Sequence, residues 1–407
     1  MQPFVLNALN IRCGGGLQKV SSFLSTLSSL ANEPDRCLVI ARKGVPICDI
    51  CAVAGLSRCE VTDTNLGRLW FELFCRNRLS KEAVCLNLGG LAMMRGAAYF
   101  VNISECAFSN LFYPEIDFWG YLGRAAKAKK RLIDAYRRFA VARSDYWIFQ
   151  TEAIRRRAVG LCGFPRNRVC VVSPSPSHLV SPQRVDPSLA EGFDRALPNC
   201  FRFLFLNGAQ PNKRIHCLPA IAQAMRSLGL RDFCFVSTMP ERHSYTVSVE
   251  QGFEEFGGSA HFTNIGPVPA EAVSSLLHTT DAVCTFSRLE SFSNNFVEAW
   301  KMQRSLVVTD ADWARESCGT GALYVDPENA VDTAHTLAEI MADATLRSSL
   351  VREGTKRLAE FPSPEEKTRL YLECIDRAKE LGPCPEKERR QIHWPRRGGR
   401  RWHPKRV

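Results

Sequence analysis

The sequence lacks the features that mark exported and membrane-spanning proteins. Its 407 residues contain no apolar run of about 18 or more, the length that a transmembrane helix needs. Residues 1–6 include no basic stretch and lead into no long apolar stretch, which argues against a secretory signal. Apolar residues make up 45% and charged residues 23%, values typical of soluble globular proteins. We therefore expect a cytoplasmic protein with a large core in each of about two domains.

The body of the chain carries little excess charge. The formal net charge is +11, but residues 383–407 alone hold nine Lys and Arg and two Glu, a net of +7. The remaining residues give little support for a nucleic-acid-binding surface, so we expect no nucleic-acid partner. The tail is rich in Arg, Gly and Pro and has no periodicity, and we expect it to be disordered.

No cysteine or histidine pattern indicates a disulfide framework or a metal site. The chain has 17 cysteines, an odd number, and no export signal, which favours reduced and mostly buried thiols. Cys48 and Cys51 form a C-x-x-C pair, but no second pair follows at a matching spacing and no His precedes His178. A zinc site would need such a second pair, so we interpret both cysteines as packing residues and expect no metal.

Short apolar segments alternate with amphipathic helical segments along most of the chain. Residues 4–9 have the pattern of a strand, Gly14-Gly15-Gly16 that of a turn, and residues 17–30 that of a helix with one apolar face. The alternation runs to residue 172 and resumes at residue 201. It indicates parallel sheets with helices on both faces. The expected fold class is α/β, with two Rossmann-like doubly wound domains that face each other across a ligand cleft.

Changes in composition indicate where the domains begin and end. Pro and Ser are frequent between the two alternating series, as in many linkers, and Pro362 precedes a last helical segment that could cross back to the first domain. We predict an N-terminal Rossmann-like domain at 1–175, a linker at 176–199, a C-terminal Rossmann-like domain at 200–363, a C-terminal helix at 364–382 and a basic tail at 383–407.

The segment 286–300 has the pattern of a ligand-binding loop that leads into a helix. It follows an apolar strand, turns through small polar residues and enters a helix near Ser293 or Asn294. A helix start offers free backbone N–H groups and a positive dipole end, which suit an anion such as a diphosphate. Glu290 and Glu298 could bracket a ligand bound there. The alternative is that Asn294 caps the helix and that both glutamates are solvated.

This segment resembles the E-x7-E motif of the family 4 glycosyltransferases, the retaining group 1 enzymes with the two-domain GT-B fold. The resemblance extends over residues 1–380 and is more specific in the C-terminal half. Residues 207–213 resemble the family's glycine-to-lysine turn, and residues 264–268 resemble its nucleotide-base loop. The N-terminal glycines resemble its glycine loop, and residues 316–327 resemble the segment that ends in Asp-Pro.

The resemblance implies a role for each matching residue. Glu290 would lie beside the donor sugar, and Lys213 would neutralise the departing diphosphate; these two are the expected catalytic residues. Glu298 would hydrogen-bond the ribose hydroxyls, and glycines would let the backbone approach the phosphates because no Cβ intervenes. The expected donor-binding residues are Glu298, Gly15, Gly16, Arg214, Gly266, Phe292, Ser293 and Asn294.

The chain departs from the family pattern in both halves. Ala209 stands where the family turn usually carries an Arg. Many relatives have a His near the acceptor in the N-terminal domain, where this chain has none. Asn102, Ser104 and Glu105 follow an apolar segment and could line the acceptor cleft instead; the alternative is loop solvation or capping.

Residues 124–143 form a strongly basic helical segment that allows two interpretations. Leu132, Tyr136 and Phe139 could pack into the N-terminal domain and leave the cations in solvent. Alternatively, the segment and the basic tail could bind an anionic membrane surface at which a lipid-linked acceptor would wait.

The resemblance implies a retaining glycosyltransferase that moves a sugar from a nucleoside diphosphate sugar to a hydroxyl of a glycan or lipid-linked acceptor. The family's habits favour cell-surface polysaccharide or lipopolysaccharide synthesis at the cytoplasmic face of the membrane, with no cofactor beyond the co-substrate. One alternative is a nucleotide-sugar epimerase of the same fold, which would need acid and base groups in the N-terminal domain. Another is a non-catalytic nucleotide- or glycan-binding relative, which Ala209 favours.

Overall fold

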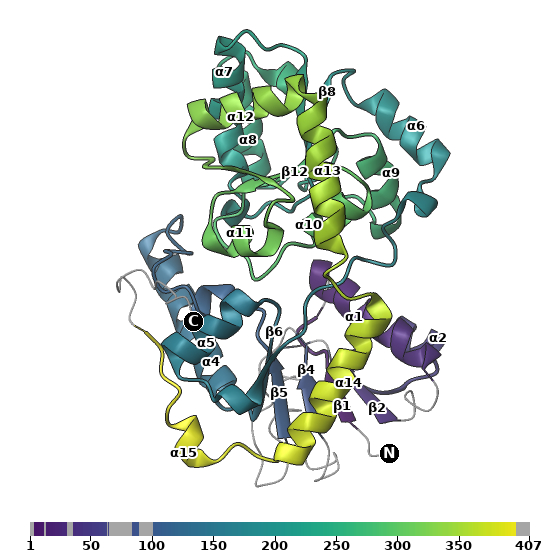
Figure 1. Cartoon of the computed structure of the whole chain (residues 1–407), viewed down its shortest axis with the longest axis vertical. Coiled ribbons are helices and arrows are strands. Elements are labelled where there is room, and N and C mark those ends of the chain that lie inside the picture. Colours follow the sequence, from purple (N-terminus) through teal and green to yellow (C-terminus); the bar gives the residue numbers. More distant parts are fainter. Residues whose placement is uncertain are drawn as a thin grey trace. The chain divides into compact units, whose positions relative to one another are not determined.

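The chain divides into two compact units in the computed structural model. Unit 1 comprises residues 1–174 and 362–407, and unit 2 comprises residues 175–361. The chain therefore passes between the units twice, and its last helices belong to the first unit (Figure 1). The structure describes residues 4–11, 14–30, 36–62, 64, 84–88 and 101–395.

Unit 1 is built on a parallel sheet of seven strands in the order β3-β2-β1-β4-β5-β6-β7. The chain starts in the middle of the sheet and extends it first to one side and then to the other, as in doubly wound folds. The strands are β1 (Phe4–Asn7), β2 (Cys37–Arg42), β3 (Ser57–Val61), β4 (Val84–Asn87), β5 (Val101–Glu105), β6 (Tyr146–Phe149) and β7 (Val169–Val171). The helices are α1 (Gly14–Ser29), α2 (Pro46–Val53), α4 (Arg124–Ala142), α5 (Glu152–Cys162), α14 (Pro364–Leu381) and α15 (Glu386–Arg389), with short 3-10 turns at Ser109–Leu111 and Arg166–Arg168.

Unit 2 repeats this architecture on a parallel sheet of six strands in the order β10-β9-β8-β11-β12-β13. The strands are β8 (Phe201–Phe205), β9 (Phe233–Ser237), β10 (Phe262–Asn264), β11 (Ala282–Thr285), β12 (Ser305–Thr309) and β13 (Leu323–Val325). The helices are α6 (Pro187–Ala196), α7 (Leu218–Ser227), α8 (Ser244–Glu254), α9 (Val273–His278), α10 (Asn294–Lys301), α11 (Asp312–Cys318), α12 (Ala330–Ala342) and α13 (Ala344–Leu358). Five 3-10 turns join them at Pro182–Arg184, Pro211–Lys213, Ile215–Cys217, Ser259–His261 and Ala270–Ala272.

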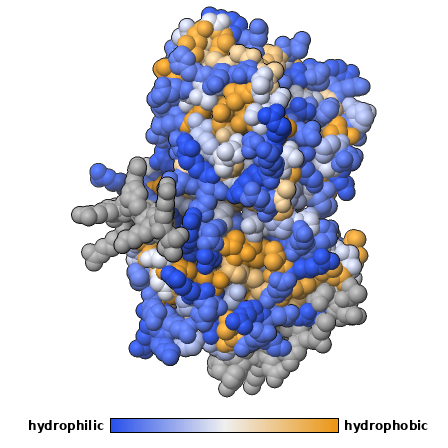
Figure 2. Space-filling model, in the orientation of Figure 1, coloured by the Kyte–Doolittle hydropathy of each residue, from blue (hydrophilic) through white to orange (hydrophobic). Residues whose placement is uncertain are grey.

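The central strands, such as β1, β4 and β11, are buried on both sides because helices cover both faces of each sheet. All five residues of β9 and of β12 are buried, for example. Apolar residues reach the surface of both units only in places on the face shown in Figure 2. The prediction of an α/β fold with two parallel sheets is confirmed. The fifteen cysteines within the described part of the chain are free thiols, most of them buried.

The segment predicted as a linker contains helix α6, so its extent was predicted wrongly. Asp186 caps this helix through its side chain, which accepts hydrogen bonds from the N–H groups of Ser188 and Leu189, and Pro187 occupies the first turn. The helix packs against α9 within unit 2. A proline directly after an aspartate starts a helix here instead of interrupting one, because the first turn needs no N–H donor there.

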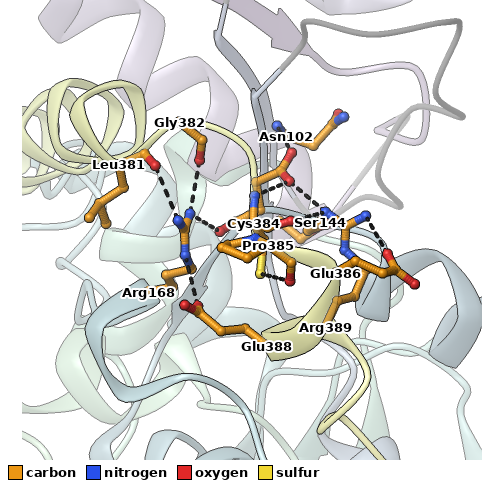
Figure 3. Close-up of polar contacts among 12 residues, drawn as sticks. Asn102, Ser144, Arg168, Leu381, Gly382, Cys384, Pro385, Glu386, Glu388 and Arg389 are labelled. Atoms are coloured by element: carbon orange, nitrogen blue, oxygen red, sulfur yellow. Dashed lines mark hydrogen bonds and ion pairs between the residues drawn. The ribbon is translucent and has the colours of Figure 1, made fainter.

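Residues 383–395 form an ordered strap on unit 1, which corrects the prediction of a disordered tail from residue 383; residues 396–407 lie outside the described part. The buried carboxylate of Asp145 accepts hydrogen bonds from the backbone N–H of Cys384 and from Arg389, both at 2.8 Å (Figure 3). Arg168 donates to the carbonyls of Leu381 and Gly382 and pairs with Glu388. Composition alone could not show these partners, because Asp145 and Arg168 lie just before β6 and β7, more than 200 residues earlier in the chain.

Helix α4 exposes the apolar side chains that one of the two interpretations packed into unit 1, so that interpretation is wrong. Leu132 is 76% exposed, Phe139 50% and Tyr136 41%. The helix instead faces its unit with Asp134, Ala140 and Val141. The Asp134 carboxylate accepts hydrogen bonds from the side chains of Asn110 and Trp119, which explains how a charged residue can lie on the inner face.

Candidate active site

The motif segment lies at the carboxyl edge of the unit 2 sheet. Strand β11 ends at Thr285, the loop passes through Glu290, and helix α10 begins at Asn294, where the sequence predicted it. Ser293 is the N-cap, but its side chain makes no capping hydrogen bond, and Asn294 is not the cap. The first N–H groups of α10 have no partner within their own helix, as at any helix start. This end of the sheet therefore presents backbone donors to a ligand.

Glu298 lies on the second turn of α10 and is buried, with 4% of its surface exposed. Its carboxylate makes no hydrogen bond or ion pair with any described residue. Burial raises the pKa of Glu298 to about 7, and Lys301 offsets part of that increase. A buried carboxylate without donors is unfavourable unless a ligand supplies them. Hydroxyl groups are suitable donors.

Lys213 and Glu290, the two predicted catalytic residues, form an ion pair at 2.9 Å, and both side chains are largely buried. The turn that carries Lys213 is held against the motif loop by hydrogen bonds from Arg288 N–H to Asn212 O and from the Asn212 side chain to Leu289 O. The structure therefore places an ammonium group and a carboxylate together at the same edge of the sheet as the start of α10.

Arg214 directs its guanidinium group into the protein. It has a left-handed backbone conformation, with φ of 54°, so its side chain points in a different direction from that of Lys213. Its Nε donates to Phe286 O at 2.7 Å, and its Nη2 donates to Thr309 Oγ1. Burial lowers the pKa of Arg214 below its ordinary value. These contacts tie Arg214 to the start of the motif segment and to the end of β12. The predicted contact of Arg214 with the donor stays a prediction.

Three buried polar atoms without partners in the described structure gather at the ends of adjacent strands. They are Ser237 Oγ at the end of β9, Asn207 Oδ1 just after β8 and Ser287 Oγ just after β11. Buried polar atoms are normally hydrogen-bonded, so three at one sheet edge indicate a ligand or ordered water there. Sequence reasoning missed Ser237 and Ser287 as candidate site residues; their places directly at strand ends were the available signal.

The remaining predicted donor-binding residues of unit 2 lie in loops near this edge. Gly266 follows β10 with φ of 74°, a backbone conformation that a Cβ would strain. Phe292 packs against Phe361 and Phe296. Ala209 packs against the apolar core of unit 2.

The unit 1 candidates separate into two groups. Gly15 and Gly16 lie in the first turn of α1 and Glu105 ends β5, so these three share the carboxyl edge of the sheet. Asn102 and Ser104 were expected after a strand but lie inside β5, fully buried. Ser104 Oγ is hydrogen-bonded to Ser144, and Asn102 N–H donates to Asp145, next to the strap. The strand runs as far as Glu105, so Asn102 and Ser104 are not loop residues.

Among the residues that the structure describes, no group of three or more His, Cys, Asp or Glu residues is arranged to hold a metal ion. No helix in the same residues combines the length and apolar character needed to span a bilayer.

Known proteins share both the C-terminal sequence pattern and the fold. Residues 244–357 match the family model of the glycosyl transferases group 1. No curated protein gives a significant sequence match to the chain. HepE from Anabaena, solved in complex with UDP and glucose, has a TM-score of 0.68 and 14% identity over 92% of this chain and 100% of its own. Sucrose-phosphate synthase from Thermosynechococcus elongatus has a TM-score of 0.67 and 15% identity, with the same coverage.

A third structure is WaaG, a glycosyltransferase involved in lipopolysaccharide biosynthesis, with a TM-score of 0.64 and 13% identity over 91% of this chain and 99% of its own. These similarities and the family match define the class: the protein is a glycosyltransferase with the GT-B fold. More particularly, its C-terminal unit carries a group 1 glycosyl transferase segment, which contains both Glu290 and Glu298.

Proposed function

We propose that this glycosyltransferase belongs to family 4 and transfers a sugar, with retention of configuration, from a nucleoside diphosphate sugar to a hydroxyl of a glycan or lipid-linked acceptor. The observation that carries the proposal is the buried Glu298 carboxylate, which has no donor within the described residues. Glu298 belongs to α10, whose start lies at the same edge of the sheet as the Lys213–Glu290 ion pair. Ribose hydroxyls would supply the missing hydrogen bonds. HepE, with the same fold, binds UDP and glucose.

The site residues favour a reaction in which the protein stabilises a leaving group. The bond from the anomeric carbon to the donor phosphate breaks, and a bond to the acceptor oxygen forms on the same face. The acceptor proton passes to the departing phosphate oxygen, so no protein nucleophile and no cofactor is needed. Lys213 and the N–H groups at the start of α10 offset the negative charge that develops on the diphosphate.

A panel of nucleoside diphosphates tests the proposal. At least one of UDP, GDP and ADP should raise the melting temperature of the full chain, because a ligand that binds only the folded state stabilises it by mass action. The measurement is a thermal-shift titration, followed by assays of nucleotide release from the matching sugar nucleotide. If no nucleotide shifts the melting temperature, the donor-binding role proposed for unit 2 is wrong.

The acceptor side of the proposal includes an anionic membrane surface, which helix α4 would contact at the cytoplasmic face. Leu132, Tyr136 and Phe139 lie on one exposed stripe of this helix, and cations flank them, with Arg143 stacked over Phe139. Exposed apolar side chains among basic ones fit the interface of an acidic bilayer. A lipid-linked precursor of a cell-surface polysaccharide or lipopolysaccharide would be presented at such a surface.

Vesicle binding should depend on this stripe. We expect the full chain to float with vesicles that contain phosphatidylglycerol and not with phosphatidylcholine alone, and to be released by high salt. Leu132→Ser with Phe139→Ser should abolish flotation, whereas the control Leu189→Ser, at a leucine of unit 2 that is 44% exposed, should not. Equal flotation of both variants would exclude α4 as the contact.

A further inference from the structure

A second polar cluster lies at the carboxyl edge of the unit 1 sheet. Its centre is Glu105, the last residue of β5, which is 1% exposed. Three donors from different elements converge on its Oε1: Lys19 from α1 at 2.7 Å, Gln150 from the end of β6 at 3.1 Å and Tyr371 from α14 at 3.1 Å. Burial alone would raise the pKa of Glu105, but Lys19 and Gln150 bring it below its ordinary value. The carboxylate is thus ionised and already engaged.

Lys367, on the first turn of α14, lies four residues before Tyr371, so it shares the face of that helix from which Tyr371 contacts Glu105 and adds a positive charge there. Its ammonium group makes no hydrogen bond or ion pair with any described residue. Burial, together with the nearby Lys19, lowers the pKa of Lys367 to about 8, and Glu105 opposes this only in part. The protein therefore holds a half-buried ammonium group that forms no ion pair with any described residue.

We propose that Lys367 and Lys19 form a subsite on unit 1 that binds a phosphate group. Lys19 uses one of the three donors of its ammonium group for Glu105 and keeps others for a ligand, and Lys367 has all of its donors to offer. Glu105 holds Lys19 in place and neutralises one of the two charges. A phosphate dianion would restore the charge balance, and charge-assisted hydrogen bonds would compensate for desolvation.

Two sources could supply the phosphate: the diphosphate of the donor or a phosphate on the acceptor. Both have the same chemistry at the subsite. Phosphate binding does not depend on transferase activity, but the part that the subsite would play in catalysis rests on the proposed function.

Phosphate binding is tested on the full chain by calorimetric titration with inorganic phosphate and by lysine footprinting. Lys367→Met should bind phosphate about tenfold more weakly, the loss expected for one charge-assisted hydrogen bond, and Lys367→Arg should restore binding. Lys379→Met, at an exposed lysine of the same helix, is the matched control and should change nothing. Phosphate should also slow acetylation of Lys367, measured by mass spectrometry, and leave that of Lys379 unchanged.

Loss of binding can be separated from misfolding, because Lys367→Met removes a desolvated charge and should unfold at the same or a higher temperature than wild type without phosphate.

A parallel titration with UDP identifies the source. If UDP binding weakens together with phosphate binding, the subsite serves the donor; if UDP binding is unchanged, it serves a phosphate on the acceptor. The proposal is overturned if wild type binds no inorganic phosphate, or if Lys367→Met binds it as well as wild type. Failure of every nucleotide to bind would contradict the proposed function and leave the phosphate result intact.

Discussion

Replacing Glu298 by Ala is expected to weaken nucleoside diphosphate binding by about 10- to 100-fold, the loss expected when a charged acceptor of hydrogen bonds is removed. The carboxylate is buried and has no donor among the described residues, so nothing in the described part of unit 2 would replace the ribose hydroxyls. Calorimetric titration of wild type and variant with the nucleotide that stabilises wild type gives the measurement. Glu254→Ala, at an exposed glutamate of α8, is the control and should bind as wild type does.

The same residue should make stability depend on pH. Its pKa is about 7 in the folded protein, against 4.5 for an ordinary glutamate, so between these values the folded state retains a proton that the unfolded chain has lost. Stability of wild type therefore falls as pH rises through this window, by about 3 kcal/mol in total for a shift of this size. Glu298→Gln has no such group and should lack that fall. Denaturant unfolding at pH 5 and pH 8 checks the difference, and identical pH profiles would contradict it.

Nucleotide binding should change in the opposite direction with pH. Ribose hydroxyls donate to the ionised carboxylate and stabilise it, so wild-type affinity should increase relative to Glu298→Gln as pH rises through 7. The comparison between the two proteins removes the effect of the ligand's own phosphate ionisation, which is common to both. If the ratio of the two affinities is independent of pH, Glu298 does not contact the nucleotide as an anion.

The sequence predicted the parts of the fold that depend on local patterns. The spacing of apolar residues and the length of each segment indicated the alternating strands and helices. The pattern of the motif segment predicted the start of α10, which the structure has at Asn294. The errors arose where a local pattern has two physical outcomes. Pro187 lies in the segment that was interpreted as a linker, but it begins a helix because Asp186 caps it. On α4, one face is apolar and exposed, while a buried Asp134 lies on the other, which inverts the usual arrangement.

Other features depend on contacts between residues that are distant in the chain. Tyr371 and Glu105 are 266 positions apart, and no spacing rule could bring the helix that carries Tyr371 and Lys367 next to Glu105. Lys213 and Arg214 were both candidates for the donor cation because they are adjacent in sequence. The left-handed conformation of Arg214 separates them, since it directs one cation to Glu290 and the other to Phe286 O.

Replacing Lys213 by Met is expected to lower kcat by about 100- to 1,000-fold, the usual loss when one fixed donor to a developing negative charge is removed. KM for the donor should change far less, because the charge on the leaving diphosphate grows mainly in the transition state. The assay follows release of nucleoside diphosphate from the sugar nucleotide that the thermal-shift panel selects. Lys356→Met, at an exposed lysine of α13, is the control and should retain wild-type kcat.

The ion pair between Lys213 and Glu290 leads to a more specific prediction. Without Lys213, the Glu290 carboxylate would remain partly buried and unpaired close to the diphosphate, so repulsion should add to the loss of the cation. Because the two residues act together, the double variant Lys213→Met with Glu290→Gln should lose less activity than the product of the two single losses. A double-mutant cycle in kcat measures this coupling. Additive effects would show that the 2.9 Å pair does not persist during turnover, and that Lys213 and Glu290 act independently on the diphosphate and on the sugar.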